Sequence, residues 1–343
     1  MTGAERVRAA LAGRWPDRRP IMLHNFRMAA REAGLTMGRF RASPANAARA
    51  FIEATEKYGL DGVLIDFDTA TLAGALGAGV EFPEDDPARV VRPRLRRLEE
   101  ARDLPPPALE ADERVGIWIE TCRLVRAHFG PAVFVRGNCD QAPFALASML
   151  RAPADWLVDL VDGGDEPFRL LDYCAGACAA FLRLVAATGV DMLSNGDSPA
   201  GPAMISPAMY RRFARPYERR LAAEAHALGL PYLIHICGDT SLILADMAAI
   251  GADALELDCL TPLRAVRAAC GGNLTLFGYL DPVGVLRDGP PARVEAAAGE
   301  LLAAFADTPR LVLGAGCALP PDTPPEHVRR LVARARESRP PGA

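Results

Sequence analysis

The chain has 343 residues, of which 50% are hydrophobic and 24% charged, with 39 Lys and Arg against 43 Asp and Glu. A chain of this length and composition can bury a large core without disulfides or metals. The formal net charge of -4 and the interspersed charges argue against nucleic acid as a partner. Because no run of 18 apolar residues and no signal-peptide pattern is present, we expect no membrane segment and a cytoplasmic location.

A short helical segment comes first, and β-prone runs then alternate with Ala-, Leu- and Arg-rich segments of helical period. We expect eight strands, at residues 20–25, 62–67, 133–138, 190–195, 231–236, 254–258, 274–279 and 310–315. Helices are predicted between them, for example over residues 206–228 and 293–306. Eight such units without a linker predict a single-domain α/β fold over residues 1–343, a (β/α)8 TIM barrel with an N-terminal helical extension.

Polar side chains follow nearly every predicted strand. Barrel enzymes carry their chemistry at the C-terminal ends of the strands, so we expect these side chains to share one pocket. Single Asp and Asn residues at strand ends are also common as turn formers and helix caps. In chain order the strand-end residues are His24, Asn25, Asp66, Asp68, Asn138, Asp140, Asn195, Asp197, His235, Cys237, Asp258, Tyr279, Asp281 and Cys317.

The segment HICGDT, residues 235–240, places a histidine and a cysteine two positions apart at a predicted strand end. Residues i and i+2 of a strand project to the same face, so His235 and Cys237 converge if that face is the interior. Zinc binds imidazole and thiolate, and catalytic zinc sites commonly use three protein ligands. Cys317, after the last strand, is the candidate third ligand. A buried histidine beside a packing cysteine has the same spacing, so both interpretations remain open.

Most of the remaining cysteines lie in apolar surroundings and are expected to pack as small hydrophobes; these are Cys122, Cys174, Cys178, Cys259 and Cys270. An ion held by two thiolates is a weak Lewis acid toward water, but it still holds an incoming thiol as the nucleophilic thiolate. Thiol alkylation is therefore the chemistry that two cysteines and a histidine favour.

Several segments of the chain resemble the uroporphyrinogen decarboxylase superfamily. They are LIDFDTATLAGALGAGVEFPED, GPAMISPAMYRRFARPYERRL, HICGDT, GYLDPVGVL and GAGCALPPDTPPEHV. Within that superfamily, HxC followed by the cysteine of GCALPPDTP is similar to the zinc-dependent methylcobamide:thiol methyltransferase branch, of which the coenzyme M methyltransferases are typical. The resemblance implies zinc (Zn2+) held by His235, Cys237 and Cys317, and methyl transfer from a methylated corrinoid such as methylcobalamin to a zinc-bound thiol.

The resemblance also implies roles for residues of the pocket. Asp68 corresponds to the essential Asp of the decarboxylases, whereas Asn25 and Ala29 stand where those enzymes carry two arginines for substrate propionates. Arg27 and Arg136 are candidate cations for an anionic acceptor. The expected catalytic residues are Asp68, Asp197 and Asp258, and the expected substrate contacts are Asn25, Arg27, Asn138 and Tyr279.

The chain contains no D-x-H-x-x-G segment, the usual signature of a corrinoid-carrying domain. We therefore expect the corrinoid to be free or carried by a separate protein, with a small-molecule thiol as acceptor. Two alternatives are a metal-independent decarboxylase of a carboxylated tetrapyrrole or related substrate, and a noncatalytic corrinoid-binding barrel with structural thiols. The sequence does not specify the donor, the acceptor thiol or the oligomeric state.

Overall fold

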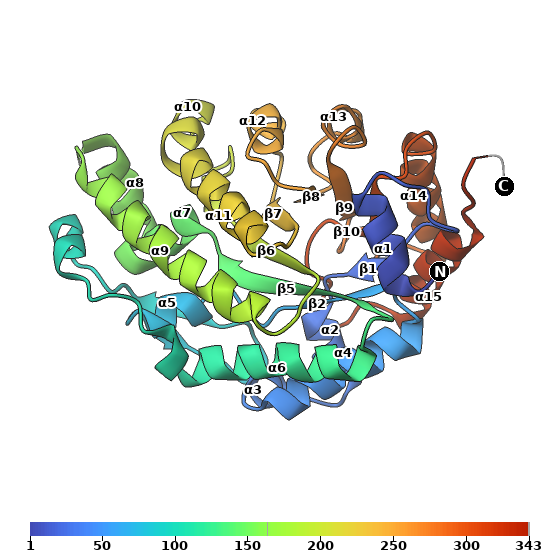
Figure 1. The fold of residues 1–343 in the computed structure, drawn as a ribbon, viewed down its shortest axis with the longest axis horizontal. Coiled ribbons are helices and arrows are strands. Elements are labelled where there is room, and N and C mark those ends of the chain that lie inside the picture. Colours follow the sequence, from blue (N-terminus) through green and yellow to red (C-terminus); the bar gives the residue numbers. More distant parts are fainter. Residues whose placement is uncertain (163, 342–343) are drawn as a thin grey trace.

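The computed structural model describes residues 1–162 and 164–341. Within these residues, eight parallel strands form a barrel with helices around it (Figure 1). Neighbouring strands in the barrel follow the chain order β1, β2, β5, β6, β7, β8, β9, β10. Their bounds are β1 (Met22–Leu23), β2 (Gly62–Ile65), β5 (Phe134–Gln141), β6 (Met192–Gly196), β7 (Tyr232–Ile236), β8 (Ala254–Leu257), β9 (Thr275–Leu280) and β10 (Leu311–Ala315).

The barrel closes between its first and last strands. Ile21 forms a parallel bridge with Leu313, whose N–H donates to the carbonyl oxygen of Pro20 at 2.8 Å. The predicted (β/α)8 barrel is thus confirmed, and each predicted strand overlaps an observed one. The first strand is shorter than expected, because Pro20 has no N–H to donate to the ladder and Asn25 already precedes a helix.

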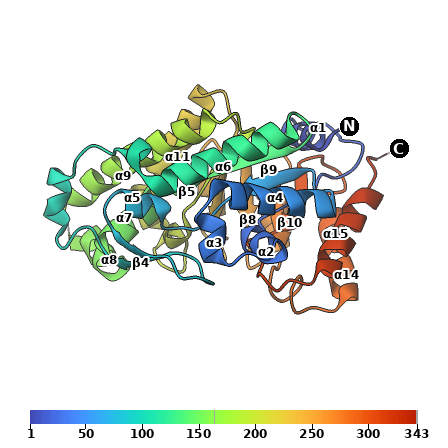
Figure 2. The ribbon, with the colours of Figure 1, turned by 90° about the horizontal axis from the view of Figure 1, so that it is seen from below.

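The α-helices that follow the strands, or lie in the connections between them, surround the barrel. In Figure 2, α4 and α6 lie side by side along one flank. The bounds are α2 (Phe26–Glu32), α3 (Met37–Arg41), α4 (Pro44–Tyr58), α5 (Thr71–Ala75), α6 (Glu113–Phe129), α7 (Pro143–Arg151), α8 (Pro153–Asp162), α9 (Glu166–Ala186), α10 (Pro207–Met209), α11 (Arg215–Ala227), α12 (Leu244–Ala248), α13 (Leu263–Ala269), α14 (Pro291–Ala304) and α15 (Pro325–Glu337). No helix of the described residues is long and apolar enough to cross a membrane.

The helix expected over residues 206–228 is interrupted. A π-helical turn, Tyr210–Ala214, separates α10 from α11. Pro216 explains the break, because it has no N–H to bond to the carbonyl group four residues earlier.

The connection between β2 and β5 holds elements that the sequence pattern does not reveal. A small antiparallel hairpin, β3 (Gly79–Glu81) and β4 (Arg89–Arg92), is followed by two 3-10 helices, Leu98–Asp103 and Leu109–Ala111. The loop of this hairpin brings Pro87 to the wall of the cavity described below.

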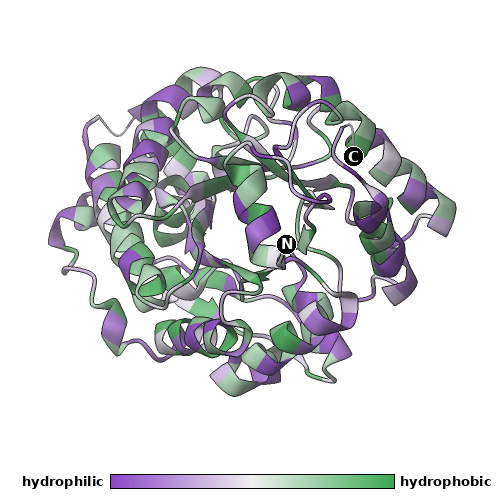
Figure 3. Ribbon diagram, turned by 45° about the vertical axis from the view of Figure 1, so that its right-hand side comes forward, coloured by the Kyte–Doolittle hydropathy of each residue, from purple (hydrophilic) through white to green (hydrophobic). Residues whose placement is uncertain are grey.

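The N-terminal helix α1 (Gly3–Leu11) lies across the N-terminal end of the barrel, and the N-terminus lies near the centre of the ring of helices in Figure 3. Ala4, Val7 and Ala10 are buried in a cluster with inward side chains from the strands. Those side chains are Met22, Phe134, Met192, Leu233, Ala254, Phe277 and Val312. The expected helical extension is therefore part of the core and closes this end of the barrel.

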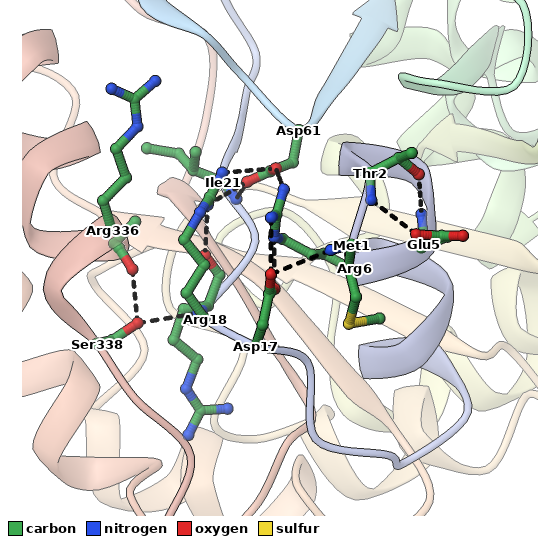
Figure 4. A network of polar contacts seen from close by, with 12 residues as sticks. Met1, Thr2, Glu5, Arg6, Asp17, Arg18, Ile21, Asp61, Arg336 and Ser338 are labelled. Atoms are coloured by element: carbon green, nitrogen blue, oxygen red, sulfur yellow. Dashed lines mark hydrogen bonds and ion pairs between the residues drawn. The ribbon is translucent and has the colours of Figure 1, made fainter. Parts of the chain in front are cut away.

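A polar network ties the same end of the barrel to the N-terminal segment (Figure 4). Asp61, which is 2% exposed, accepts hydrogen bonds from Arg18 at 2.7 and 2.9 Å and from Arg6 at 3.1 Å. It also accepts the N–H of Ile21 at 3.0 Å. With one end closed in this way, the C-terminal end of the barrel is the place for a site.

Candidate metal centre and substrate pocket

His235, Cys237 and Cys317 come together at the C-terminal end of the barrel. His235 Nε2 lies 3.0 Å from Cys237 Sγ, which lies 3.6 Å from Cys317 Sγ. The three potential ligand atoms all lie within 4.8 Å of one another. Because the residues belong to β7, the loop after β7 and the loop after β10, the closure of the barrel brings them together.

Two glycines shape the backbone around the thiols. Gly238 has φ +87°, which lets the chain turn directly after Cys237. The N–H groups of Cys237 and Gly238 donate to Ser198 Oγ at 3.2 Å and Asp258 Oδ2 at 3.0 Å. Next to the other cysteine, a Cβ at Gly316 would lie 2.7 Å from a carbonyl oxygen at the end of β8, so only glycine fits. The backbone beside each cysteine is thus constrained, by a turn and hydrogen bonds at Cys237 and by close packing at Gly316 next to Cys317.

The geometry fits a zinc ion. His235 Nδ1 lies 3.0 Å from the main-chain oxygen of Glu256, so in the neutral, metal-binding form of the imidazole the proton sits on Nδ1 and Nε2 faces the thiols. With zinc–sulfur bonds of about 2.3 Å in a tetrahedral site, two thiolate sulfurs lie about 3.8 Å apart. The observed separation of 3.6 Å is close to that value. One imidazole and two thiolates also suit zinc far better than magnesium or calcium.

The charge state of Cys237 differs from that of the packing cysteines. The hydrogen bond with Cys317, together with the neighbouring His235, lowers the pKa of Cys237 to about 4, although burial opposes this. Burial alone would lower the pKa of His235, but the negative charge of Cys237 raises it to about 9. Burial instead raises the pKa of Cys122 and Cys270 to about 12. Without an ion, Cys237 is therefore a thiolate at neutral pH, the form that binds metals, whereas the same hydrogen bond together with burial raises the pKa of Cys317.

A cavity of about 400 Å³ lies beside the three ligands. Of the residues predicted from the sequence, Arg27, Asp68 and Asn138 line this cavity, as do His235, Cys237 and Cys317. The structure therefore brings six of the ten predicted site residues to one place.

Asp197 and Asp258 do not belong to the cavity wall in the described residues. Asp197 is fully buried and accepts the N–H of Ala145 at 2.7 Å. Asp258 accepts the N–H groups of Gly238 and Leu260, both at 3.0 Å. Both carboxylates accept main-chain N–H groups, Asp197 from the first turn of α7 and Asp258 from the loops after β7 and β8, so any influence on the site passes through these segments.

Asn25 and Tyr279 also lie outside the described wall of the cavity. Tyr279 donates its hydroxyl to the carbonyl oxygen of Thr261 at 2.7 Å, and Asn25 is buried directly before α2. Asp68 does line the cavity, yet its Oδ1 accepts two main-chain N–H groups at the start of α5, both at 2.9 Å. Burial raises the pKa of the Asp68 carboxyl.

Glu256 is a site residue that strand-end reasoning does not single out, and Arg136 lies deeper than expected. Each is 3% exposed, and together they form an ion pair inside the barrel. Arg136 lines the cavity, as expected of a candidate cation, but its guanidinium is already paired with Glu256. The sequence does contain a signal for this pair, because Arg136 and Glu256 each lie within an apolar strand. A charged residue in such a position is rarely buried without a partner.

Fold and site together define a (β/α)8 barrel with a candidate metal centre and a cavity at its open end. The family model for uroporphyrinogen decarboxylase (URO-D) matches residues 2–338. The chain belongs to this family, as its sequence motifs predict.

Relatives in the family have two different activities. The methylcobamide:CoM methyltransferase MtbA of Methanosarcina mazei is 28% identical over 284 residues, which are 82% of this chain and 81% of that protein. A uroporphyrinogen decarboxylase of Thermus thermophilus is 30% identical over 286 residues, which are 81% of this chain and 80% of that decarboxylase. The first relative agrees with the expected corrinoid-dependent methyltransferase, but overall identity does not separate the two activities.

The fold itself has a close structural counterpart. A solved methyltransferase from Methanosarcina mazei superimposes with a TM-score of 0.90 and 24% identity, covering 98% of this chain and 99% of that one. At this identity the likeness shows the barrel fold. The chemistry must therefore be inferred from the residues of the site.

Proposed function

We propose that this protein is a zinc-dependent methyltransferase that moves a methyl group from a methylated corrinoid to a small-molecule thiol. The observation that carries the proposal is the approach of His235, Cys237 and Cys317 to one another beside a cavity of about 400 Å³. Three protein ligands leave a fourth zinc position for a substrate. The name of the MtbA relative, with methylcobamide and CoM in it, supports the class of donor and acceptor.

In this proposal the protein mainly positions and activates the acceptor. Zinc, when bound by the three side chains, supplies a site that holds the acceptor sulfur as a thiolate. The main-chain oxygen of Glu256 keeps the ring of His235 oriented with Nε2 toward the thiols. The acceptor sulfur forms a bond to the methyl carbon while the cobalt–carbon bond of the donor breaks and cobalt retains the electron pair. Such a displacement depends on in-line placement of the two substrates.

We assign Arg27 to an anionic group on the acceptor. It lines the cavity from the first turn of α2, and its ion pair with Asp86 is long, at 3.9 Å. Asp86 is itself largely exposed, whereas Arg136 is occupied by Glu256. Asn138 lines the same cavity and offers amide hydrogen-bonding groups to the acceptor.

The second candidate is a decarboxylase, which the Thermus thermophilus relative supports. Asp68 would be its acidic residue, and Asp68 does line the cavity. Two features oppose this function. The arginines for substrate propionates are replaced by Asn25 and Ala29, and a metal-independent decarboxylase has no use for a converging imidazole and two thiols.

The proposal is tested by incubating the purified protein with methylcobalamin and a panel of anionic and neutral thiols. We expect one zinc per chain and loss of the methylcobalamin absorption spectrum only when a thiol is present, with a methyl thioether as product. Uroporphyrinogen should be left unchanged. Decarboxylation of uroporphyrinogen by a zinc-free preparation would instead establish the second candidate.

A further inference from the structure

A closed ring of polar side chains lies inside the barrel, next to the candidate metal centre. Barrel interiors are usually filled by layers of branched apolar side chains. Here one layer consists of side chains from or directly after β1, β2, β5, β6 and β8. The members of this polar ring are His24, Asp66, Asn138, Ser194, Arg136 and Glu256, all buried or nearly so.

One half of the polar ring runs from β1 to β6. His24 Nε2 lies 2.6 Å from Asp66 Oδ2. Asn138 donates from Nδ2 to Asp66 Oδ1 at 2.9 Å, and it accepts the hydroxyl of Ser194 at 3.3 Å. These contacts connect four neighbouring strands across the inside of the barrel.

The other half closes the polar ring through β8. Arg136 Nε donates to Ser194 Oγ at 2.8 Å, and Arg136 Nη1 forms an ion pair with Glu256 Oε2. Glu256 Oε1 then lies 3.4 Å from His24 Nδ1. Burial opposes the charge on His24, but Asp66 and Glu256 raise its pKa to about 9. The polar ring thus contains two cations and two anions, and it has no net charge.

The polar ring touches the metal centre through His235. The ring nitrogen Nδ1 contacts the main-chain oxygen of Glu256 at 3.0 Å, and the Glu256 carboxylate lies 3.9 Å from the same nitrogen. Nε2, on the other side of the imidazole, faces Cys237. Outer carboxylates and carbonyls of this kind fix the orientation of a metal-binding histidine and raise its basicity.

We propose that the polar ring positions His235 for metal binding, and that Arg136 is the positioning residue that holds the Glu256 carboxylate on the Nδ1 side of the imidazole. This inference rests on the proposed metal centre. Burying two ion pairs costs desolvation free energy, and apolar residues of similar volume often stabilise a fold as well or better. A role in positioning His235 would explain why the barrel contains these charges nevertheless.

The test uses zinc affinity, measured by chelator competition, and the visible spectrum of the cobalt(II)-substituted protein. Removing an outer partner of a metal-binding histidine weakens affinity by roughly 10- to 100-fold. We expect a loss near the lower end of that range, with a shifted cobalt(II) spectrum, in both Glu256→Gln and Arg136→Met, because both variants keep the main-chain oxygen that contacts Nδ1. Because Arg136 acts through Glu256 in this proposal, the double variant should bind zinc no more weakly than Glu256→Gln alone.

Arg18→Met is the matched control, because Arg18 pairs with buried Asp61 at the opposite end of the barrel. It should lower thermal stability and leave zinc affinity and the cobalt(II) spectrum unchanged. If Glu256→Gln and Arg136→Met behave like this control, the polar ring is only structural and the inference is overturned. If the unmodified protein binds no zinc, the proposed function itself is wrong. This result differs from the one that overturns only the inference, in which the unmodified protein and both variants bind zinc equally well.

Discussion

The Sγ atoms of Cys237 and Cys317 lie 3.6 Å apart although 80 residues separate them in the chain. Their loops follow β7 and β10, which have two other strands between them in the barrel. Both thiols are only partly buried, whereas Cys122, Cys174 and Cys178 are completely buried. Packing accounts for the second group, and we propose that binding of a shared zinc ion accounts for the first.

Replacing a proposed ligand should abolish metal binding without unfolding the protein. For His235→Ala and Cys237→Ala we expect a greater loss of zinc affinity than the roughly 10- to 100-fold typical of an outer partner. Methyl transfer should disappear, while circular dichroism and the unfolding midpoint stay close to those of the parent. Residues at the open end contribute little to the core of a barrel. Unfolding of both variants would point to a structural metal instead.

Cys317 offers a sharper comparison between the two candidate functions. Cys317→Ala should lose zinc and methyl transfer, whereas Cys259→Ala, which alters another partly buried thiol outside the cavity wall, should keep both. Zinc is quantified by mass spectrometry and methyl transfer by the methylcobalamin spectrum. Retention of zinc and activity in Cys317→Ala would remove the third ligand from the proposal.

Arg27 should determine the preference for anionic acceptors. A hydrogen bond to a charged group is worth about 1.5–3 kcal/mol, which corresponds to roughly 10- to 100-fold in affinity. Arg27→Ala should raise the KM for anionic thiols by about this factor, with little effect on kcat or on neutral thiols. Arg31→Ala, which removes a cation from an adjacent pocket, is the control. Equal effects on charged and neutral thiols would contradict the assignment.

Stability should fall as the pH rises through neutrality, because of a buried acid behind the site. Burial raises the pKa of Glu218 to about 7, although hydrogen bonds with Tyr210 and Asp197 oppose the shift. Between about pH 4.3, the ordinary value for Glu, and pH 7 the folded state therefore binds more protons than the unfolded state. The stabilisation is complete at the low end of this range and is lost as the carboxyl ionises.

This prediction is measured by urea unfolding between pH 5 and 8. We expect the free energy of unfolding to decrease by an amount on the order of 1–3 kcal/mol, and Glu218→Gln to make the profile shallower. Glu224→Gln on the same helix, at a half-buried position paired with Arg183, should leave the profile unchanged. A parent-like slope in Glu218→Gln would assign the pH dependence to other groups.

Much of the fold, and the approach of the three candidate metal ligands to one another, follows from short-range rules. Alternating strand and helix periods predict the barrel, and the i, i+2 rule places His235 and Cys237 on one face. Cys317 follows from the rule that strand ends share one rim. These predictions hold because they depend on element type and order rather than on particular contacts.

The remaining parts of the site depend on three-dimensional pairing. Strand-end position does not distinguish Asp68, which lines the cavity, from Asp197, whose side chain accepts the N–H of Ala145 in the first turn of α7. Arg136 and Glu256 are 120 residues apart, and only the register of the strands makes them partners. A charged residue within an apolar strand predicts that it has a partner, but the sequence does not identify that partner.

The most direct test of the metal centre is zinc K-edge X-ray absorption of the purified protein, recorded with and without a thiol acceptor. The account predicts one zinc per chain, bound by two sulfurs at about 2.3 Å and one imidazole nitrogen at about 2.0–2.1 Å, with a third sulfur appearing when the thiol is added. Absence of zinc, or a site with four protein ligands that the thiol leaves unchanged, would contradict it.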